Sequence, residues 1–131
     1  MEEKKKRLGE AELEIMQVLW KAGSPVTSNY ILDKLRGKRK WALSTLMTSL
    51  SRLGEKGFVD CDRSCRNNQY SALLKEEDYK VSESRSFLKK LYNNSFHNLV
   101  TTLYDGHMLE EKDLDELRRF LNQMDKEEKG C

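Results

Sequence analysis

Residues 41–72, WALSTLMTSLSRLGEKGFVDCDRSCRNNQYSA, carry in order the signals of a short helix, a glycine stop and a two-stranded hairpin. Leucines at positions 43, 46, 50 and 53 recur at helical spacing and are expected to line one buried face. Gly57 is suited to end the helix, because glycine adopts the left-handed conformation without strain. A strand is predicted to begin at Phe58, and the returning strand passes through Tyr70.

The other face of this predicted helix is polar, and its side chains are short apart from one arginine. It carries Ser44, Thr45, Thr48, Ser49, Ser51 and Arg52. A helix with small polar side chains fits deep into the major groove of DNA, where side chains reach the base edges. We therefore expect DNA contacts from Ser44, Thr45, Thr48, Ser49 and Arg52.

The hairpin tip, residues 62–68, adds Arg63 and Arg66, which are expected to hold phosphate groups beside the groove. A reading helix followed by a basic hairpin is the arrangement of a winged helix-turn-helix. Trp41 opens the segment and is expected to fill the gap between this helix and the preceding one. The alternative for Trp41 is stacking on a sugar or base.

Length and composition indicate one small, mostly helical, soluble protein. The chain has 131 residues, of which 37% are hydrophobic and 35% are charged. No apolar run approaches the roughly 20 residues that a membrane-spanning helix needs, so direct membrane insertion is not expected. The first ten residues, MEEKKKRLGE, lack the apolar segment of a signal peptide. These features predict a cytoplasmic protein.

The charges are distributed unevenly along the chain. Residues 34–66 carry nine Lys or Arg against three Asp or Glu, whereas residues 76–131 carry nine against thirteen. Ordinary scatter of surface charge is the simple explanation. Because the positive excess coincides with the predicted reading helix and hairpin, it favours binding of nucleic acid.

Hydrophobic periodicity predicts six helices, at residues 10–22, 28–36, 43–56, 76–92, 95–104 and 110–126. Thr27 or Ser28 is expected to cap the second, and Val26 to add a short strand. The predicted fold is mostly α with a small β-hairpin. It comprises a winged helix-turn-helix domain over 1–74 and a three-helix dimerisation domain over 75–131, because helix-turn-helix proteins usually read two-fold sites as dimers. The residues expected at the dimer interface are Phe87, Leu91, Phe96, Leu99, Val100, Leu103, Leu117 and Leu121.

Groups that would support catalysis are scarce. The two histidines, His97 and His107, match no ligand or triad spacing, and the sequence has no phosphate-binding loop or nucleophile elbow. Cys61 and Cys65 form the one pair that suggests a metal or redox site, but tetrahedral zinc needs more ligands. The sequence therefore predicts no enzyme, no catalytic residue, no metal and no cofactor.

In the order and spacing of its segments, the chain resembles the penicillinase-repressor family of bacterial transcription regulators, also called BlaI/MecI/CopY. The resemblance covers about residues 8–124. It is carried by LGEAELEIMQVLW at 8–20, Trp41 with Thr45, SRLGEKGFVD at 51–60, QYSALL at 69–74, SFLKKLYNNSFHNLV at 86–100 and LDELRRFL at 114–121.

The resemblance implies a homodimer that represses a resistance operon from a palindromic operator in double-stranded DNA. It also implies release by proteolysis in the C-terminal domain, triggered by a membrane-embedded sensor-protease that detects β-lactam. Copper-responsive relatives use a C-terminal cysteine cluster, which Cys131 alone does not match.

Two segments depart from the family pattern. The family usually has Trp-Ser-Pro-Lys-Thr where this chain has Trp41-Ala42-Leu43-Ser44-Thr45, so the usual cap and first-turn proline are missing. Ser44 is expected to cap a helix that begins two residues later. The family's scissile bond, commonly Asn-Phe, falls at Thr102-Leu103, which is the candidate cleavage bond here.

Two other functions remain open from the sequence. One is a winged-helix module that binds another protein through the short polar helix. The other is a metal- or redox-responsive regulator that uses Cys61 and Cys65.

Overall fold

The structure is a computed structural model that describes residues 7–37 and 40–129. The chain divides into two compact units, one ending at Glu83 and the other beginning at Ser84. This division differs from the expected boundary after Leu74. It falls inside a helix, α5 (Glu76–Tyr92), because the first half of that helix packs on the N-terminal unit.

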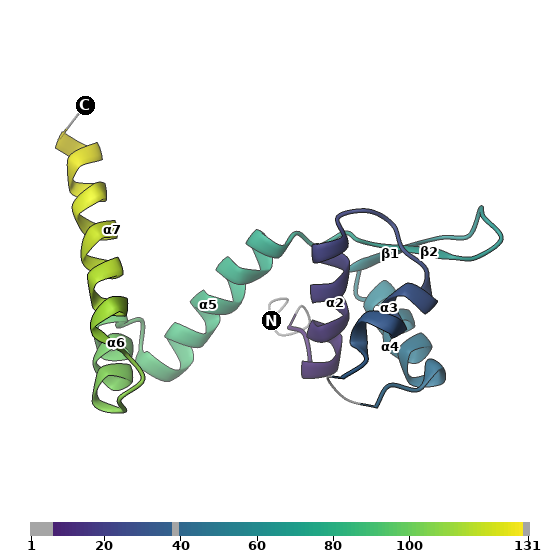
Figure 1. Cartoon of the computed structure of the whole chain (residues 1–131), viewed down its shortest axis with the longest axis horizontal. Coiled ribbons are helices and arrows are strands. Elements are labelled where there is room, and N and C mark those ends of the chain that lie inside the picture. Colours follow the sequence, from purple (N-terminus) through teal and green to yellow (C-terminus); the bar gives the residue numbers. More distant parts are fainter. Residues whose placement is uncertain (1–6, 38–39, 130–131) are drawn as a thin grey trace. The chain divides into compact units, whose positions relative to one another are not determined.

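Three helices build the core of the N-terminal unit: α2 (Glu10–Ala22), α3 (Ser28–Leu35) and α4 (Leu43–Glu55), drawn in purple and blue in Figure 1. Their buried apolar side chains meet in one cluster, as the helical spacing predicts. The fully buried members are Ile15, Met16, Ile31, Leu35, Leu46 and Leu53. This cluster fixes the relative positions of the three helices and so determines which face of α4 remains exposed.

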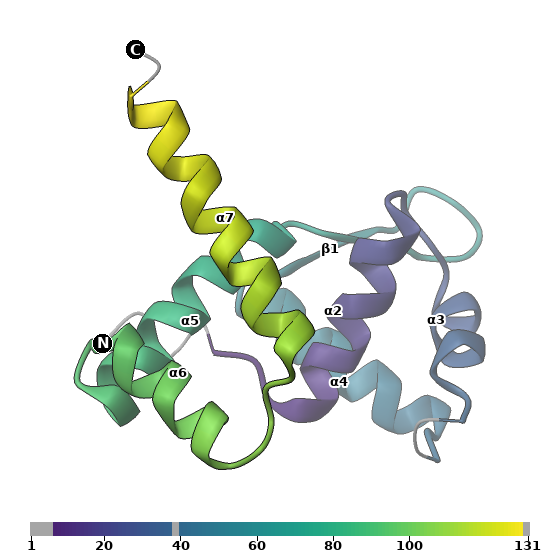
Figure 2. The ribbon, with the colours of Figure 1, turned by 60° about the vertical axis from the view of Figure 1, so that its left-hand side comes forward.

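A hairpin of β1 (Val59–Asp62) and β2 (Gln69–Ala72) follows α4, and its tip extends beyond α3 and α4 in Figure 1; Figure 2 shows the loop at the tip from another side. The strands are antiparallel, with Cys61 opposite Tyr70. Val26 forms an isolated bridge to Tyr70, which confirms the expected short third strand. Gly57 joins α4 to β1 with φ of 83°, so the predicted left-handed glycine stop is confirmed.

The first half of α5 is held to the N-terminal unit by aromatic side chains. The Tyr79 ring lies 6.0 Å from the Trp20 ring, and its hydroxyl accepts a hydrogen bond from the Leu8 backbone N–H at 3.2 Å. Trp20 Nε1 donates to the Leu74 carbonyl oxygen at 2.8 Å. These contacts tie the start of α5 to α2, so the N-terminal unit includes residues after the hairpin.

The C-terminal unit consists of the second half of α5, α6 (Phe96–Asp105) and α7 (Glu111–Lys129). Asn93 and Asn94 have φ of 50° and 67° and separate α5 from α6, as the sequence predicts. Helix α6 ends at Asp105 with Gly106 at the cap position, and the following residue, His107, has φ of 60°. Across residues 84–127, no side chain is buried within the single chain. This unit therefore lacks the closed core that the N-terminal unit has.

In the described part of the chain, none of the helices combines the length and apolar character needed to cross a bilayer.

Candidate nucleic-acid interface

Helix α4 begins at Leu43, directly after Ala42, although no side chain caps it. Ala42 occupies the cap position with extended backbone, and its carbonyl accepts from the Leu46 N–H at 3.0 Å. The expectation that Ser44 caps a later helix start is wrong. Leu46 packs into the core within the first turn and stabilises the helix there, and Ser44 lies inside the helix and is exposed.

The core and solvent faces of α4 are clearly separated. Leu46, Leu50 and Leu53 are buried. The side chains exposed on the opposite side are Ser44, Thr45, Thr48 and Arg52, while Ser49 is half-buried at the edge. The structure thus brings the predicted reading residues onto one exposed surface of one helix. The exception is Leu43, which was expected in the core but is 48% exposed, because it lies one turn before the buried stripe begins.

The Thr48 hydroxyl donates a hydrogen bond to the Ser44 carbonyl oxygen one turn earlier, at 3.0 Å. This bond uses the hydroxyl proton and leaves the oxygen lone pairs pointing outward as acceptors. Amino groups on adenine or cytosine are the donors that such an acceptor meets in the major groove. The local helix geometry therefore favours Thr48 as a hydrogen-bond acceptor, rather than a donor, toward DNA.

Arg52 is exposed on α4, and its guanidinium forms no ion pair with any residue that the structure describes. Its neighbour Lys56 instead donates to the Glu12 carboxylate at 2.9 Å. Burial opposes ionisation of Glu12, but hydrogen bonds from Lys56 and the Gly9 N–H, with the nearby Arg52 charge, hold its pKa below the usual range. Because Lys56 is paired with Glu12, Arg52 is the cation of the two that is free of an ion pair with a described residue and can contact DNA.

The hairpin tip presents Arg63 and Arg66, both exposed. The turn before them is fixed by Asp62, whose Oδ1 accepts from the Ser64 N–H at 2.9 Å and from the Ser64 hydroxyl at 2.6 Å. These two hydrogen bonds lower the pKa of Asp62. The turn at the tip is therefore fixed by hydrogen bonds beside two exposed cations.

The two wing cysteines lie in different environments. Cys61 is half-buried on β1 and Cys65 is exposed at the tip, and both thiols are free. Burial raises the pKa of the Tyr70 hydroxyl, and the adjacent Cys61 thiol adds to the rise. Among the residues that the structure describes, no cluster of three His, Cys, Asp or Glu side chains is arranged to hold a metal ion. Cys131 lies outside the described residues.

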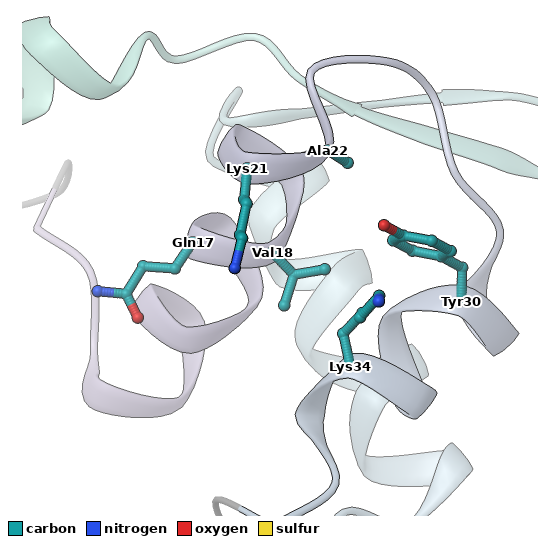
Figure 3. A pocket seen from close by; sticks show the side chains of 6 residues that line it. All are labelled: Gln17, Val18, Lys21, Ala22, Tyr30 and Lys34. Carbon is teal, nitrogen blue, oxygen red and sulfur yellow. The ribbon is translucent and has the colours of Figure 1, made fainter.

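An open pocket of about 630 Å³ lies between α2 and α3 (Figure 3). Its lining consists of Gln17, Val18, Lys21, Ala22, Tyr30 and Lys34. The Lys34 ammonium lies 5.4 Å from the centre of the Tyr30 ring, a cation–π contact. Among the described residues, the titratable side chains that line it are two lysines and one tyrosine.

The three-helix core, the exposed polar face of α4 and the basic hairpin define a winged helix-turn-helix protein of the DNA-binding class. The sequence model of the family described as "Penicillinase repressor" matches residues 8–123. The chain belongs to this family and is a DNA-binding transcriptional repressor. The resemblance seen in the sequence is thereby confirmed.

Characterised relatives match along almost their whole length. The methicillin resistance regulatory protein MecI of Mammaliicoccus sciuri is 31% identical over 122 residues, covering 93% of this chain and 98% of the relative. The penicillinase repressor of Bacillus licheniformis is 30% identical over 117 residues, covering 89% and 91%. A solved structure of monomeric Bacillus licheniformis BlaI with the blaP half-operator is 33% identical, covers 56% of this chain and 88% of its own, and has a TM-score of 0.48. These relatives do not favour the protein-interaction or metal-sensing alternatives.

Proposed function

We propose that this repressor binds a palindromic operator as a homodimer, with α4 in the major groove and the hairpin on the flanking backbone. The observation that carries this proposal is the exposed face of α4, which carries short hydroxyl side chains and the exposed Arg52. Short side chains allow the helix backbone to approach the base edges closely, and arginine pairs well with guanine.

The charge of the reading surface supports the same placement. Arg63 and Arg66 extend from the wing, and Arg36 and Lys40 are exposed before α4. Cations around a polar helix attract the phosphates on either side of the groove and release counterions when they bind. The test is binding to a duplex selected from a random pool, measured at several salt concentrations. Sequence-specific binding that weakens steeply with salt supports the proposal, and binding to no duplex overturns it.

The proposed dimer rests on the C-terminal unit. None of its described side chains is buried in the single chain, and large apolar groups are exposed, with Leu91 at 64% and Phe96 at 55%. Leu99, Val100, Leu103 and Leu117 are only half-buried. Exposed apolar surface on several successive helices indicates a missing partner, and a second copy of the unit supplies the same surface. We infer that Phe87 and Leu121 join these residues in the interface.

A charge substitution on α7 tests the dimer. Leu117→Glu places a carboxylate in the proposed interface, whereas Gln123→Glu introduces the same side chain on the other side of the helix. Sedimentation equilibrium should give a monomer mass for the first variant and a dimer mass for the second. Equal dimerisation of both variants would show that the interface lies elsewhere.

We further propose that the regulated genes confer antibiotic resistance and that a sensor-protease ends repression by cutting Thr102-Leu103 in α6. Thr102 is exposed and Leu103 half-buried. Both lie within α6, where the Thr102 carbonyl accepts from the Gly106 N–H at 3.0 Å. A protease needs extended backbone, so the last turn of α6 must unwind before cleavage. The compartment proposed for the repressor is the cytoplasm, where bacterial DNA lies.

A further inference from the structure

Two large apolar side chains interrupt the polar surface at the beginning of α4. Leu43 is 48% exposed and Met47 is 38% exposed. They lie four residues apart and therefore neighbour each other on the helix surface. Ser44 lies three residues before Met47 and so borders the pair on the polar face, and Thr48 lies one turn after Ser44 on that same face. The result is a small apolar strip along one side of the proposed reading surface.

The surroundings of this strip identify the partner that fits it. Two exposed cations, Arg36 and Lys40, precede it in the chain, and this positive charge favours a polyanion over an ordinary apolar protein surface. Residues at the beginning of a recognition helix are those that contact base edges. The apolar group that DNA presents in the major groove is the 5-methyl of thymine.

We propose that Leu43 and Met47 read thymine methyl groups in the operator half-site. This inference rests on the proposed placement of α4 in the major groove. The strip packs against the methyl, while the Ser44 and Thr48 hydroxyls meet polar edges of neighbouring bases. Cytosine lacks the methyl group, and its amino group finds no acceptor on the apolar strip. Thymine is therefore preferred over cytosine at this position.

Deoxyuridine tests this assignment, because it pairs like thymidine and lacks only the methyl group. The duplex selected by the unchanged protein is resynthesised with one thymine per half-site replaced by deoxyuridine, position by position, and Kd is measured for each. We expect a loss of roughly 3- to 5-fold per methyl at one or two positions, near the transfer free energy of one buried carbon. The Leu43→Ala and Met47→Ala variants should bind the thymine duplex more weakly than the unchanged protein does. Replacing thymine by uracil should then lower their affinity little further.

Two matched variants complete the experiment. Met47→Leu keeps an apolar side chain and should retain the penalty for uracil. Leu73→Ala removes a leucine outside α4 that is 58% exposed and should leave both affinities and the penalty unchanged. The inference is overturned if a protein that still binds its duplex specifically loses no affinity when thymine is replaced by uracil. It is also overturned if this loss is as large in the Leu43→Ala and Met47→Ala variants as in the unchanged protein. A protein that selects no duplex overturns the proposed function and this inference together.

Discussion

The ammonium group of Lys56 lies 2.9 Å from Oε1 and 3.0 Å from Oε2 of Glu12, so the end of α4 is fastened to the beginning of α2. The same Oε1 accepts from the Gly9 N–H at 3.0 Å and closes the first turn of α2. The Glu12 side chain is only 13% exposed. One carboxylate thus joins the start of the first helix to the helix proposed to read DNA.

Replacing Glu12 should destabilise the protein in a pH-dependent way. Glu12→Gln keeps an acceptor for Gly9 but removes the charge opposite Lys56, and should cost about 1–2 kcal/mol at neutral pH. The pKa of Glu12 is lowered in the folded protein, so its stabilisation is present above the unfolded-state pKa and is lost as pH falls through the folded-state pKa. Urea unfolding at several pH values should show the two proteins converging in acid.

The control for this effect is Glu77→Gln, which neutralises an exposed carboxylate in the first turn of α5. It should change stability by only a few tenths of a kcal/mol. If Glu12→Gln is no more destabilising than this control at neutral pH, the ion pair does not hold α4.

Loss of base contacts should weaken specific binding. Thr48→Val keeps the shape but removes the acceptor oxygen, and Arg52→Ala removes the exposed guanidinium. Each should lose ~1–3 kcal/mol of operator binding, with relaxed preference at one base pair. Fluorescence anisotropy with the selected duplex measures the loss. Lys34→Ala, which removes a cation from the pocket between α2 and α3, serves as the control. Unchanged operator affinity in both variants would refute the reading-helix assignment.

Removing the wing arginines should weaken DNA binding without changing the preference for particular base pairs. Arg63→Ala and Arg66→Ala should weaken binding to all duplexes alike and reduce the slope of log Kd against log salt by about one unit each. Lys21→Ala, another exposed cation of the same unit, should leave the slope unchanged. A change in sequence preference on removing either wing arginine would instead mean that the wing reads bases.

The uncapped start of α4 offers a stabilising substitution. Ala42→Ser supplies a hydroxyl at the cap position and should raise stability by about 1 kcal/mol. Thr27→Ala is the matched opposite, because the Thr27 hydroxyl accepts from the Tyr30 N–H at 3.2 Å and caps α3. It should lower stability by a similar amount. Thermal melts that move in the same direction for both variants would contradict the capping assignment.

Cutting α6 should release DNA. A recognition site for a laboratory protease can be placed at Thr102-Leu103. Cleavage there separates α7 from the rest of the chain and removes part of the proposed interface. Because two linked reading helices raise each other's effective concentration, cleavage should lower operator affinity ~10²–10⁴-fold. The same site placed after Lys126 leaves most of α7 attached and should have little effect. A cut protein that remains a tight-binding dimer would exclude this switch.

Much of the fold follows from residues whose local signal and packing agree. Gly57 predicts the stop after α4, and Leu46, Leu50 and Leu53 predict its buried face. The predicted range 43–56 begins where α4 begins, but the cap was misplaced at Ser44 because Ala42 gives no capping signal, and Leu43 was misplaced in the core because it resembles one more core leucine by spacing alone. Its exposure depends on where the core ends, which is a tertiary property.

Contacts between residues far apart in the chain could not be predicted from the sequence either. Lys56 and Glu12 are far apart in the chain, and neither stands out among the many charged residues. The packing of Tyr79 on Trp20 places the unit boundary inside a continuous helix, where no composition change marks it. The exposed polar residues of α4 were found because a strong helical period fixes which side chains share a face.

We propose that this chain reads a two-fold DNA site as a dimer through α4. The most direct test of this proposal is the stoichiometry and affinity of binding to the selected duplex, with and without one half-site scrambled. We expect two chains on a palindrome whose half-site centres lie one helical turn or a multiple apart, about 10 base pairs per turn. Scrambling one half-site should cost roughly 10²-fold or more. One chain per duplex, with an affinity that ignores the second half-site, would contradict the account.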